Sequence, residues 1–301
     1  MTPDHHAVRR TGLLVATAGG LFLSFDIPLV RLTEGNLWPV LALRSLSTLV
    51  VALLAMAVIR FVLGRREAFV PGRAGLLAGL FYGLSTMAFV AAVYHTTTAN
   101  VVFIVAFSPM FAALLSWLFM KEVPSRSTLI TMGAMVAGVV LIVGDGLAAG
   151  HFVGDLLALT AAVLIAAGLT TARASGQPMG FVPLLASAIP AAISLFFAWP
   201  EGFAMQSPGW ALLDGLVMMP VAFWLLATAP RFLPAAEVGM FYLLETVLAP
   251  VWMWMIFREA PSTATLLGGT LIVGALLAHS LAGLHARQNG RAAAQRRGIT
   301  P

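Results

Sequence analysis

The sequence contains no cysteine and a single lysine, Lys121. Without cysteine there is no disulfide, no thiol nucleophile and no thiolate metal site. No glycine-rich phosphate loop ends in that lysine, so ATP hydrolysis by a P-loop is excluded. The six histidines lack the His-Glu-x-x-His spacing, and no Gly-x-Ser-x-Gly elbow occurs. We therefore expect no metal, no cofactor and no enzyme active site.

Charge is scarce as well. Only 10% of the residues are charged and 60% are apolar, whereas about a quarter of the residues in soluble domains are charged. A soluble chain of this length could not cover so much apolar surface, so lipid is the expected solvent. The net charge of +5 does not indicate nucleic acid, because the basic residues lie in the loops between apolar runs and act as topology signals.

The apolar residues form ten runs, each close to the roughly 20 residues that span a bilayer. The first run follows basic residues, as a signal peptide does, but it is long and carries Asp26 and Pro28, so we expect it to be retained. The connections are short, and no soluble domain is inserted. The expected spans are 11–32, 37–61, 72–93, 97–119, 127–145, 154–173, 180–199, 209–229, 235–257 and 263–284.

The basic residues orient these spans. With the N-terminus inside, the opposite face receives only Arg31 and Arg258, and Arg44 lies within the second span. The remaining fourteen of the 17 Lys and Arg residues (17 − 3) fall on the inner face. This positive-inside pattern predicts that both termini are cytoplasmic, in a multi-pass protein of the cell inner membrane.

The second half of the sequence repeats the end of the first. Segment 98–125 corresponds to 235–262 at a constant offset, 259 − 122 = 137. Because five is odd, duplicating five spans places the second copy upside down, as in many secondary transporters. We predict an all-α membrane protein with two inverted five-helix repeats, residues 1–147 and 148–286, and a basic tail, 287–301.

Small residues at helical spacing predict close helix packing within the membrane. Such a row of small residues forms a helix-packing seam. The structural interpretation is a seam that stays fixed, and the functional one is a seam that slides during transport. The expected seams are Gly75, Gly79 and Gly83 in the third span, Ala134 and Gly138 in the fifth, and Thr270, Gly274 and Ala278 in the tenth.

Several motifs resemble the EamA-type repeat of the drug/metabolite transporter superfamily. They are Ala99, Pro109 and Lys121-Glu122 in the fourth span, Pro234-Ala235-Ala236, Leu244-Glu245 and Arg258-Glu259 in the ninth, and Leu43-Arg44 in the second. The resemblance covers nearly the whole chain and implies a transporter.

Two positions depart from the family's pattern. Asp26 lies where a tryptophan-glycine pair is common, and Thr246 lies where a proline usually follows the glutamate. Within the superfamily, segment 237–240 (Glu-Val-Gly-Met) is similar to YddG-type aromatic amino acid exporters.

Ionisable groups at membrane depth are costly and are therefore site candidates. Glu237, Phe241 and Glu245 share one helix face, and Tyr242 flanks it. A carboxylate there could bind a substrate ammonium, and the rings could stack on its side chain. Alternatively, Glu245 caps broken backbone or bonds a neighbouring helix, and Glu237 lies near the cytoplasmic mouth.

The same offset pairs Asn100 with Glu237, so Asn100 and Phe103 would face the pathway from the other repeat. A helix-to-helix hydrogen bond is the alternative for Asn100. Tyr82 and Trp224 are weaker candidates, because aromatic residues in spans more often pack or anchor.

Asp26 and Arg44 carry opposite charges on adjacent spans, and an ion pair is the cheapest way to keep both in lipid. Alternatively, Arg44 binds a substrate carboxylate and Asp26 takes up a proton, which would suit a gate.

The leading hypothesis is a secondary-active or facilitative exporter of amino acids. It would bind its substrate in a midplane cavity and carry it across the membrane by alternating access. Aromatic amino acids are favoured by the resemblance, with methionine or threonine as further substrates. The alternatives are a carrier of another metabolite or drug, a nucleotide-sugar carrier, a membrane enzyme acting on lipids, and a non-transporting receptor. The chain would be a monomer or homodimer.

Overall fold

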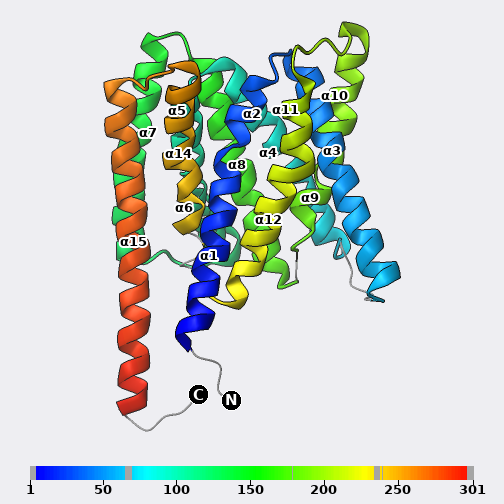
Figure 1. The fold of residues 1–301 in the computed structure, drawn as a ribbon. Helices are drawn as coiled ribbons and strands as arrows, with labels where there is room; N and C mark the ends of the chain where they lie inside the picture. Colours follow the sequence, from blue (N-terminus) through cyan, green and yellow to red (C-terminus); the bar gives the residue numbers. More distant parts are fainter. Residues whose placement is uncertain (1–4, 65–69, 178, 234–237, 239, 297–301) are drawn as a thin grey trace.

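The computed structural model describes residues 5–64, 70–177, 179–233, 238 and 240–296. Within this part of the chain the regular structure is helical, and nine helical stretches are long and apolar enough to cross a membrane (Figure 1). The ninth of the ten expected spans is represented by a shorter apolar helix, Leu243–Phe257. Glu237, one of the candidate site residues, lies outside the described residues, as do 234–236 and Gly239.

The spans in the first half of the chain consist of α1 (His5–Ser24) with α2 (Asp26–Leu32), α3 (Leu37–Ala57) with the π-helix η1 (Val58–Val62), α4 (Gly72–His95), α5 (Thr98–Val105) with α6 (Ser108–Met120), and α7 (Arg126–Ala148). Those in the second half consist of α8 (Phe152–Ser175), α9 (Val182–Leu185) with α10 (Ala188–Glu201), α11 (Pro208–Leu213) with the π-helix η2 (Asp214–Met218) and α12 (Met219–Thr228), α14 (Leu243–Phe257), and α15 (Thr263–Arg296). The short 3-10 helix η3 (Ala229–Arg231) follows α12.

Three of these spans are interrupted shortly before a proline. Proline lacks the backbone N–H and its ring clashes with the carbonyl four residues earlier, so the preceding helix ends there. The pairs of interruption and proline are Phe25 with Pro28, 106–107 with Pro109, and 186–187 with Pro190.

The helix of the ninth span is also interrupted, at Tyr242, although Thr246 stands where a proline would explain the break. Pro250, further along, lies inside the intact α14. The helix is therefore interrupted at Tyr242 without a proline in the usual place.

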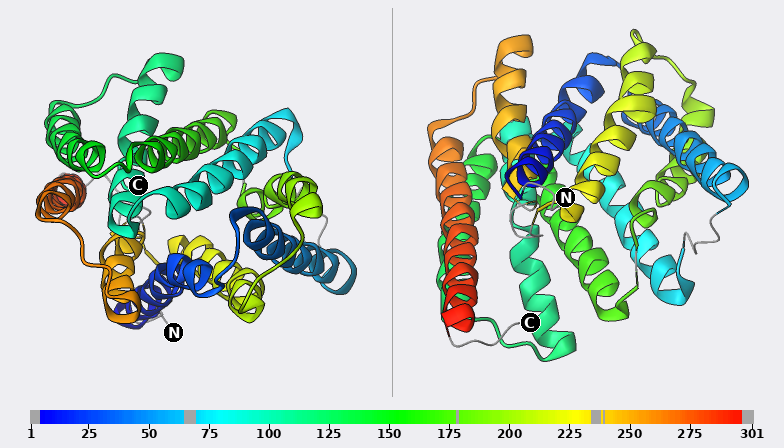
Figure 2. Two further views of the ribbon diagram at one scale, coloured as in Figure 1. Left: turned by 90° about the horizontal axis from the view of Figure 1, so that it is seen from above. Right: turned by 60° about the horizontal axis from the view of Figure 1, so that its bottom comes forward.

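The helices pack in a pattern that recurs between the two halves of the chain. Span 3 (α4) makes extensive contacts with span 6 (α8), and span 8 (α12) makes them with span 1 (α1). Smaller contacts join span 4 (α6) to span 6 (α8) and span 9 (α14) to span 1 (α1). The other main pairs, α3 with α10, α5 with α14 and α7 with α15, join spans five apart (Figure 2).

The buried apolar side chains form two clusters of unequal extent. The larger includes Ile27, Val93, Ile104, Ala158 and Met253, from both halves of the chain. The smaller joins α1 to α12 and the segment after it. Among the described residues, the main apolar core therefore joins the two halves of the chain.

The expected small-residue seams are partly present. A Cβ on Gly138 would meet Ile272 Cγ1 at 2.6 Å and Gly268 O at 2.7 Å, so α7 and α15 touch backbone to backbone. Gly83 is similarly tight against Ile189. Nothing lies within 4 Å of a Cβ on Gly274, so the seam predicted there is wrong: α15 meets α7 through Gly268, nearer its N-terminus.

Candidate functional site

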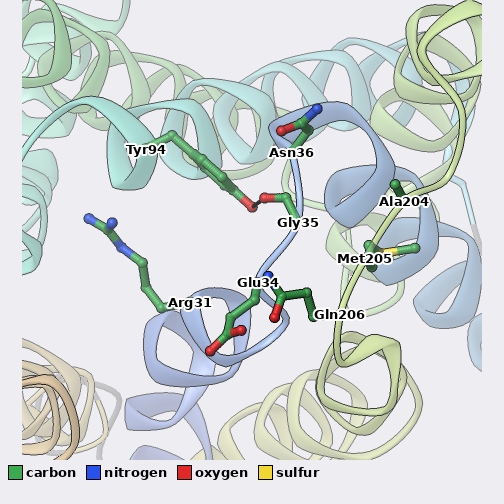
Figure 3. Close-up of a pocket in the computed structure, with 8 residues that line it drawn as sticks. All are labelled: Arg31, Glu34, Gly35, Asn36, Tyr94, Ala204, Met205 and Gln206. Atoms are coloured by element: carbon green, nitrogen blue, oxygen red, sulfur yellow. Dashed lines mark hydrogen bonds between the residues drawn. The ribbon is translucent and has the colours of Figure 1, made fainter.

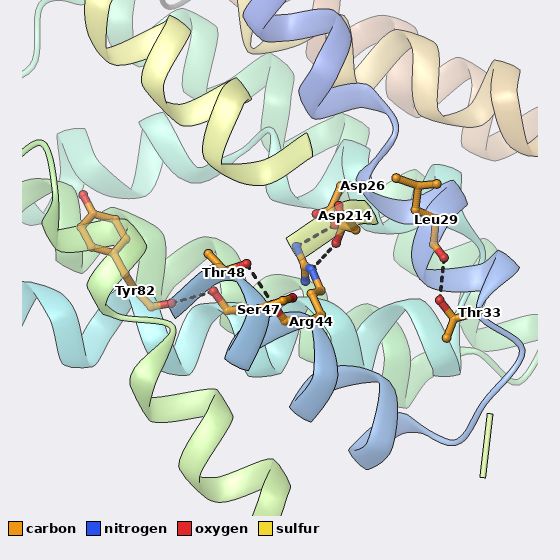
Figure 4. Close-up of polar contacts among 9 residues, drawn as sticks. Asp26, Leu29, Thr33, Arg44, Ser47, Thr48, Tyr82 and Asp214 are labelled. Carbon is orange, nitrogen blue, oxygen red and sulfur yellow. Dashed lines mark hydrogen bonds and ion pairs between the residues drawn. The ribbon is translucent and has the colours of Figure 1, made fainter. Parts of the chain in front are cut away.

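Asp26, Arg44 and Asp214 form a buried ionic cluster between three spans. Arg44 Nη2 lies 2.6 Å from Asp26 Oδ1, and Arg44 Nε donates to Asp214 Oδ2 at 2.6 Å. All three side chains are at most 5% exposed. Figure 4 shows both carboxylates meeting the guanidinium. The ion pair expected between Asp26 and Arg44 is present, and Asp214 joins it.

Asp26 and Asp214 each lie where a regular α-helix is interrupted. Asp26 is the first residue of α2, directly after the interruption at Phe25, where the helix N-terminus favours negative charge. Asp214 opens the π-helix η2, and π-bulges recur at functional sites. Gly215 beside it has no side chain because a Cβ there would overlap Arg44 O and Ser47 Oγ. The close approach of η2 to α3 therefore depends on this glycine.

Sequence reasoning missed Asp214, although the signal was present. It lies inside the expected span 209–229, and the rule that marked Asp26 marks it equally. Its addition changes the charge balance, because one guanidinium now faces two carboxylates. Arg44 Nη1 and Asp214 Oδ1 are buried with no hydrogen-bond partner among the described residues.

Glu245 adds a third carboxylate to this region. It lies in the first turn of α14, just after the interruption at Tyr242, and is partly buried. Asp26, Arg44 and Asp214 lie within electrostatic range of it, but no hydrogen bond or ion pair joins it to them among the described residues. Four spans, the first, second, eighth and ninth, thus bring charged groups to one place.

Two tyrosines extend the site from Glu245. Tyr242 is 42% exposed and interacts electrostatically with Glu245 and with Tyr82. The Tyr82 ring packs on α8, where a Cβ on Gly168 would meet it at 2.9 Å. The two phenol groups and the Glu245 carboxylate therefore lie in one neighbourhood.

The other aromatic candidates lie elsewhere. Phe241 is partly buried and packs against the smaller cluster of α1 and α12. Trp224 is 65% exposed, on the same face of the eighth span as the exposed Val217. Trp252, not singled out in the sequence, stacks on Phe25 with ring centroids 4.9 Å apart and donates to Ser24 Oγ at 3.0 Å.

Asn100 belongs to a second buried polar cluster, in the upper half. Its Nδ2 donates to Asp155 Oδ1 at 3.1 Å, and its Oδ1 accepts from Thr265 Oγ1 at 2.8 Å. Thr96 Oγ1 donates to the same Asp155 oxygen at 2.7 Å. The cluster ties the fourth span to the sixth and tenth, which is the helix-to-helix alternative for Asn100.

Phe103 packs on α15. It is 8% exposed, and a Cβ on Gly269 would overlap its ring. In this structure α5 thus presents Asn100 and Phe103 to α8 and α15, and their role along the pathway stays a prediction. Asp155, fully buried, was missed because it lies at the edge of the expected span 154–173.

Comparison with known proteins agrees with this architecture. The EamA-like transporter family matches residues 10–144. A solved crystal structure is similar with a TM-score of 0.62 and 19% identity, over 91% of this chain and 98% of that one, which shows a shared fold. No curated protein matches the sequence. The chain is thus a multi-pass membrane protein in which residues 10–144 match the EamA-like transporter family, and this match indicates a transporter of the drug/metabolite type.

Proposed function

We propose that the protein is a secondary-active or facilitative exporter of amino acids, with aromatic amino acids favoured and methionine or threonine as further substrates. The observation that carries this proposal is the convergence of Asp26, Arg44, Asp214 and Glu245 where two spans are interrupted. Charged groups at membrane depth mark substrate pathways, and interrupted helices form the binding sites of many transporters.

The chain would work as two inverted repeats, residues 1–147 and 148–286. The recurrence of span contacts between the halves supports this, since adding five to each span number maps one set of pairs onto the other. Both termini would be cytoplasmic, in the inner membrane. The α1 start and the α15 end lie at the same, lower side in Figure 1, and the basic residues favour that side as the inner one.

In the alternating-access cycle that we propose, the larger apolar cluster and the network around Asp155 would close the outer side. Rocking of the repeats would break these contacts and close the lower half instead.

In the site, Glu245 would bind the substrate ammonium, and Tyr242, Tyr82 and Phe241 would contact its side chain. Arg44 would bind the substrate carboxylate only by exchange, because its Nε and Nη2 already meet aspartates. Glu237 and Trp224 remain candidates of the same pathway. A nucleotide sugar is disfavoured, because three carboxylates around one guanidinium repel phosphate.

Proteoliposome transport tests the proposal. Labelled phenylalanine should enter vesicles containing the protein faster than empty vesicles, and Glu245→Gln should abolish the difference. Glu122→Gln is the matched control, because Glu122 is a half-exposed glutamate paired with Arg173 on the lower face. Equal uptake in full and empty vesicles across a panel of amino acids would remove the amino acid claim.

A further inference from the structure

We propose that a cavity on the upper face is a second binding site, for a zwitterionic α-amino acid arriving from or leaving to the outside. The cavity is a broad depression open to solvent, with a volume of about 730 Å³, which is large enough for a small molecule. Its substrate class and its outward position rest on the proposed function. Figure 3 shows the residues that line it: Arg31, Glu34, Gly35, Asn36, Tyr94, Ala204, Met205 and Gln206.

Two loops from opposite halves of the chain build the cavity. The loop after α2 pairs with the loop before α11 through a bridge between Gly35 and Met205. Gln206 N donates to Glu34 O at 3.2 Å, and Tyr94 Oη donates to Gly35 O at 3.0 Å. The lining is therefore held by the paired backbones of the two loops and by the Tyr94 hydroxyl on Gly35.

The lining carries one positive and one negative group. Arg31 uses Nη2 to donate to Thr96 O at 3.2 Å, while its Nε is buried with no partner among the described residues. Glu34 is exposed, and no ion pair between Glu34 and Arg31 is formed. In Figure 3 the guanidinium and the carboxylate lie apart, with the Tyr94 ring above the guanidinium.

Glu34 also has an uncommon backbone. Its φ is +49°, in the left-handed region that side chains other than glycine rarely adopt. Glu34 follows Thr33, the C-cap of α2, so this conformation ends the helix and turns the chain into the loop. The turn places Glu34 among the residues that line the cavity.

The chemistry of the lining selects a zwitterion. A guanidinium binds a carboxylate with two hydrogen bonds, and a carboxylate binds an ammonium. Tyr94 and Met205 offer apolar surface to a side chain, and the amides of Asn36 and Gln206 offer further hydrogen bonds. An anion or a cation alone would leave one charged group without a partner.

The cavity is separate from the midplane site. Asp26 begins and Leu32 ends the seven-residue α2, so Arg31 lies at the opposite end of that helix from the ionic cluster. Ile27 and Val30, between them, are 1% exposed and belong to the larger apolar cluster. The buried apolar residues of α2 therefore lie between the ionic cluster and the cavity.

Equilibrium binding of labelled L-phenylalanine to the full chain in lipid nanodiscs tests the proposal. We expect two sites per chain. Arg31→Gln and Glu34→Gln should each weaken one site by roughly tenfold or more, the loss expected for one charge-assisted hydrogen bond, and leave the other unchanged. Arg258→Gln is the matched control, because Arg258 is an exposed arginine of the same face outside the cavity.

Two analogues separate the charges. Phenethylamine lacks the carboxylate, so its binding at the upper site should be weak and unaffected by Arg31→Gln. N-acetylphenylalanine lacks the ammonium, so Glu34→Gln should not weaken its binding.

The outcomes distinguish this proposal from the proposed function. A single site that is lost with Glu245→Gln and unaffected by Arg31→Gln and Glu34→Gln overturns the upper site alone. A single site lost with Arg31→Gln and kept with Glu245→Gln supports the upper site and contradicts the midplane one. An absence of any phenylalanine binding contradicts both.

Discussion

Lys121 and Arg258 end two different helices, α6 and α14, in the same left-handed backbone conformation, with φ of 58° and 59°. Four residues after each, a serine caps the next helix. Ser125 Oγ and Ser262 Oγ each accept from the backbone N–H three residues on, at 3.1 and 3.0 Å. The offset of 137 seen in the sequence (258 − 121) is thus repeated in local structure.

Replacing Lys121 or Arg258 with glycine should stabilise the protein. A left-handed conformation costs a residue with a side chain about 1 kcal/mol, and glycine avoids that cost. We expect each change to raise the free energy of unfolding by about 1 kcal/mol, measured by SDS-driven unfolding in mixed micelles. Lys121→Ala is the control and should give no gain. A gain with alanine as large as with glycine would show that backbone strain is not the cause.

Arg44→Gln should strongly destabilise the protein. Removing the guanidinium leaves Asp26 and Asp214 buried without a counter-charge, and breaking such a pair costs roughly 3–5 kcal/mol. Folded yield and unfolding in micelles measure the loss. Adding Asp26→Asn and Asp214→Asn to Arg44→Gln should recover more than half of it. A triple variant no more stable than the single one would argue against charge as the reason.

Gly138→Ala should weaken the contact between α7 and α15, whereas Gly144→Ala should not. A Cβ at Gly138 would overlap Gly268 O and Ile272, while a Cβ at Gly144 meets nothing within 4 Å. Overpacking costs typically about 1–3 kcal/mol, and alanine in an open helix position is neutral or better. Unfolding of the two variants side by side provides the measurement. Equal behaviour would show that the helices can separate without loss.

Asn100→Ala separates the two roles considered for Asn100. Loss of its bonds to Asp155 and Thr265 leaves buried polar groups unsatisfied, which costs about 1–3 kcal/mol. We therefore expect a lower free energy of unfolding with an unchanged KM for phenylalanine uptake. Substrate binding by Asn100 would instead raise KM and leave stability nearly intact.

The positions of the spans followed from the sequence because each needs only a local property. A run of about 20 apolar residues must become a helix in lipid, since no other local structure satisfies its backbone. The expected spans 37–61 and 263–284 became Leu37–Val62 and Thr263–Ala282. The interruptions at Phe25 and 106–107 also have a local cause, the prolines that follow.

The site was only half predictable. Asp26 and Arg44 lie on consecutive spans, and pairing lowers the cost of burying two opposite charges in lipid, so this ion pair could be predicted. The third member could not be assigned in the same way, because Asp214 is 170 residues from Arg44 along the chain. Only the packing of the eighth span on the second, through Gly215, brings them together.

The sequence by itself determined the solvent, the helices and the candidate charges, because hydrophobicity, proline and net charge act within one span or between its ends. The tertiary structure alone decided which side chains meet. It turned Asn100 and Phe103 of α5 toward α8 and α15, and it brought Asp214 to Arg44 through the contact of η2 with α3. Periodicity says which residues share a helix face, but it does not say what that face will touch, because neighbours distant in sequence determine the helix rotation.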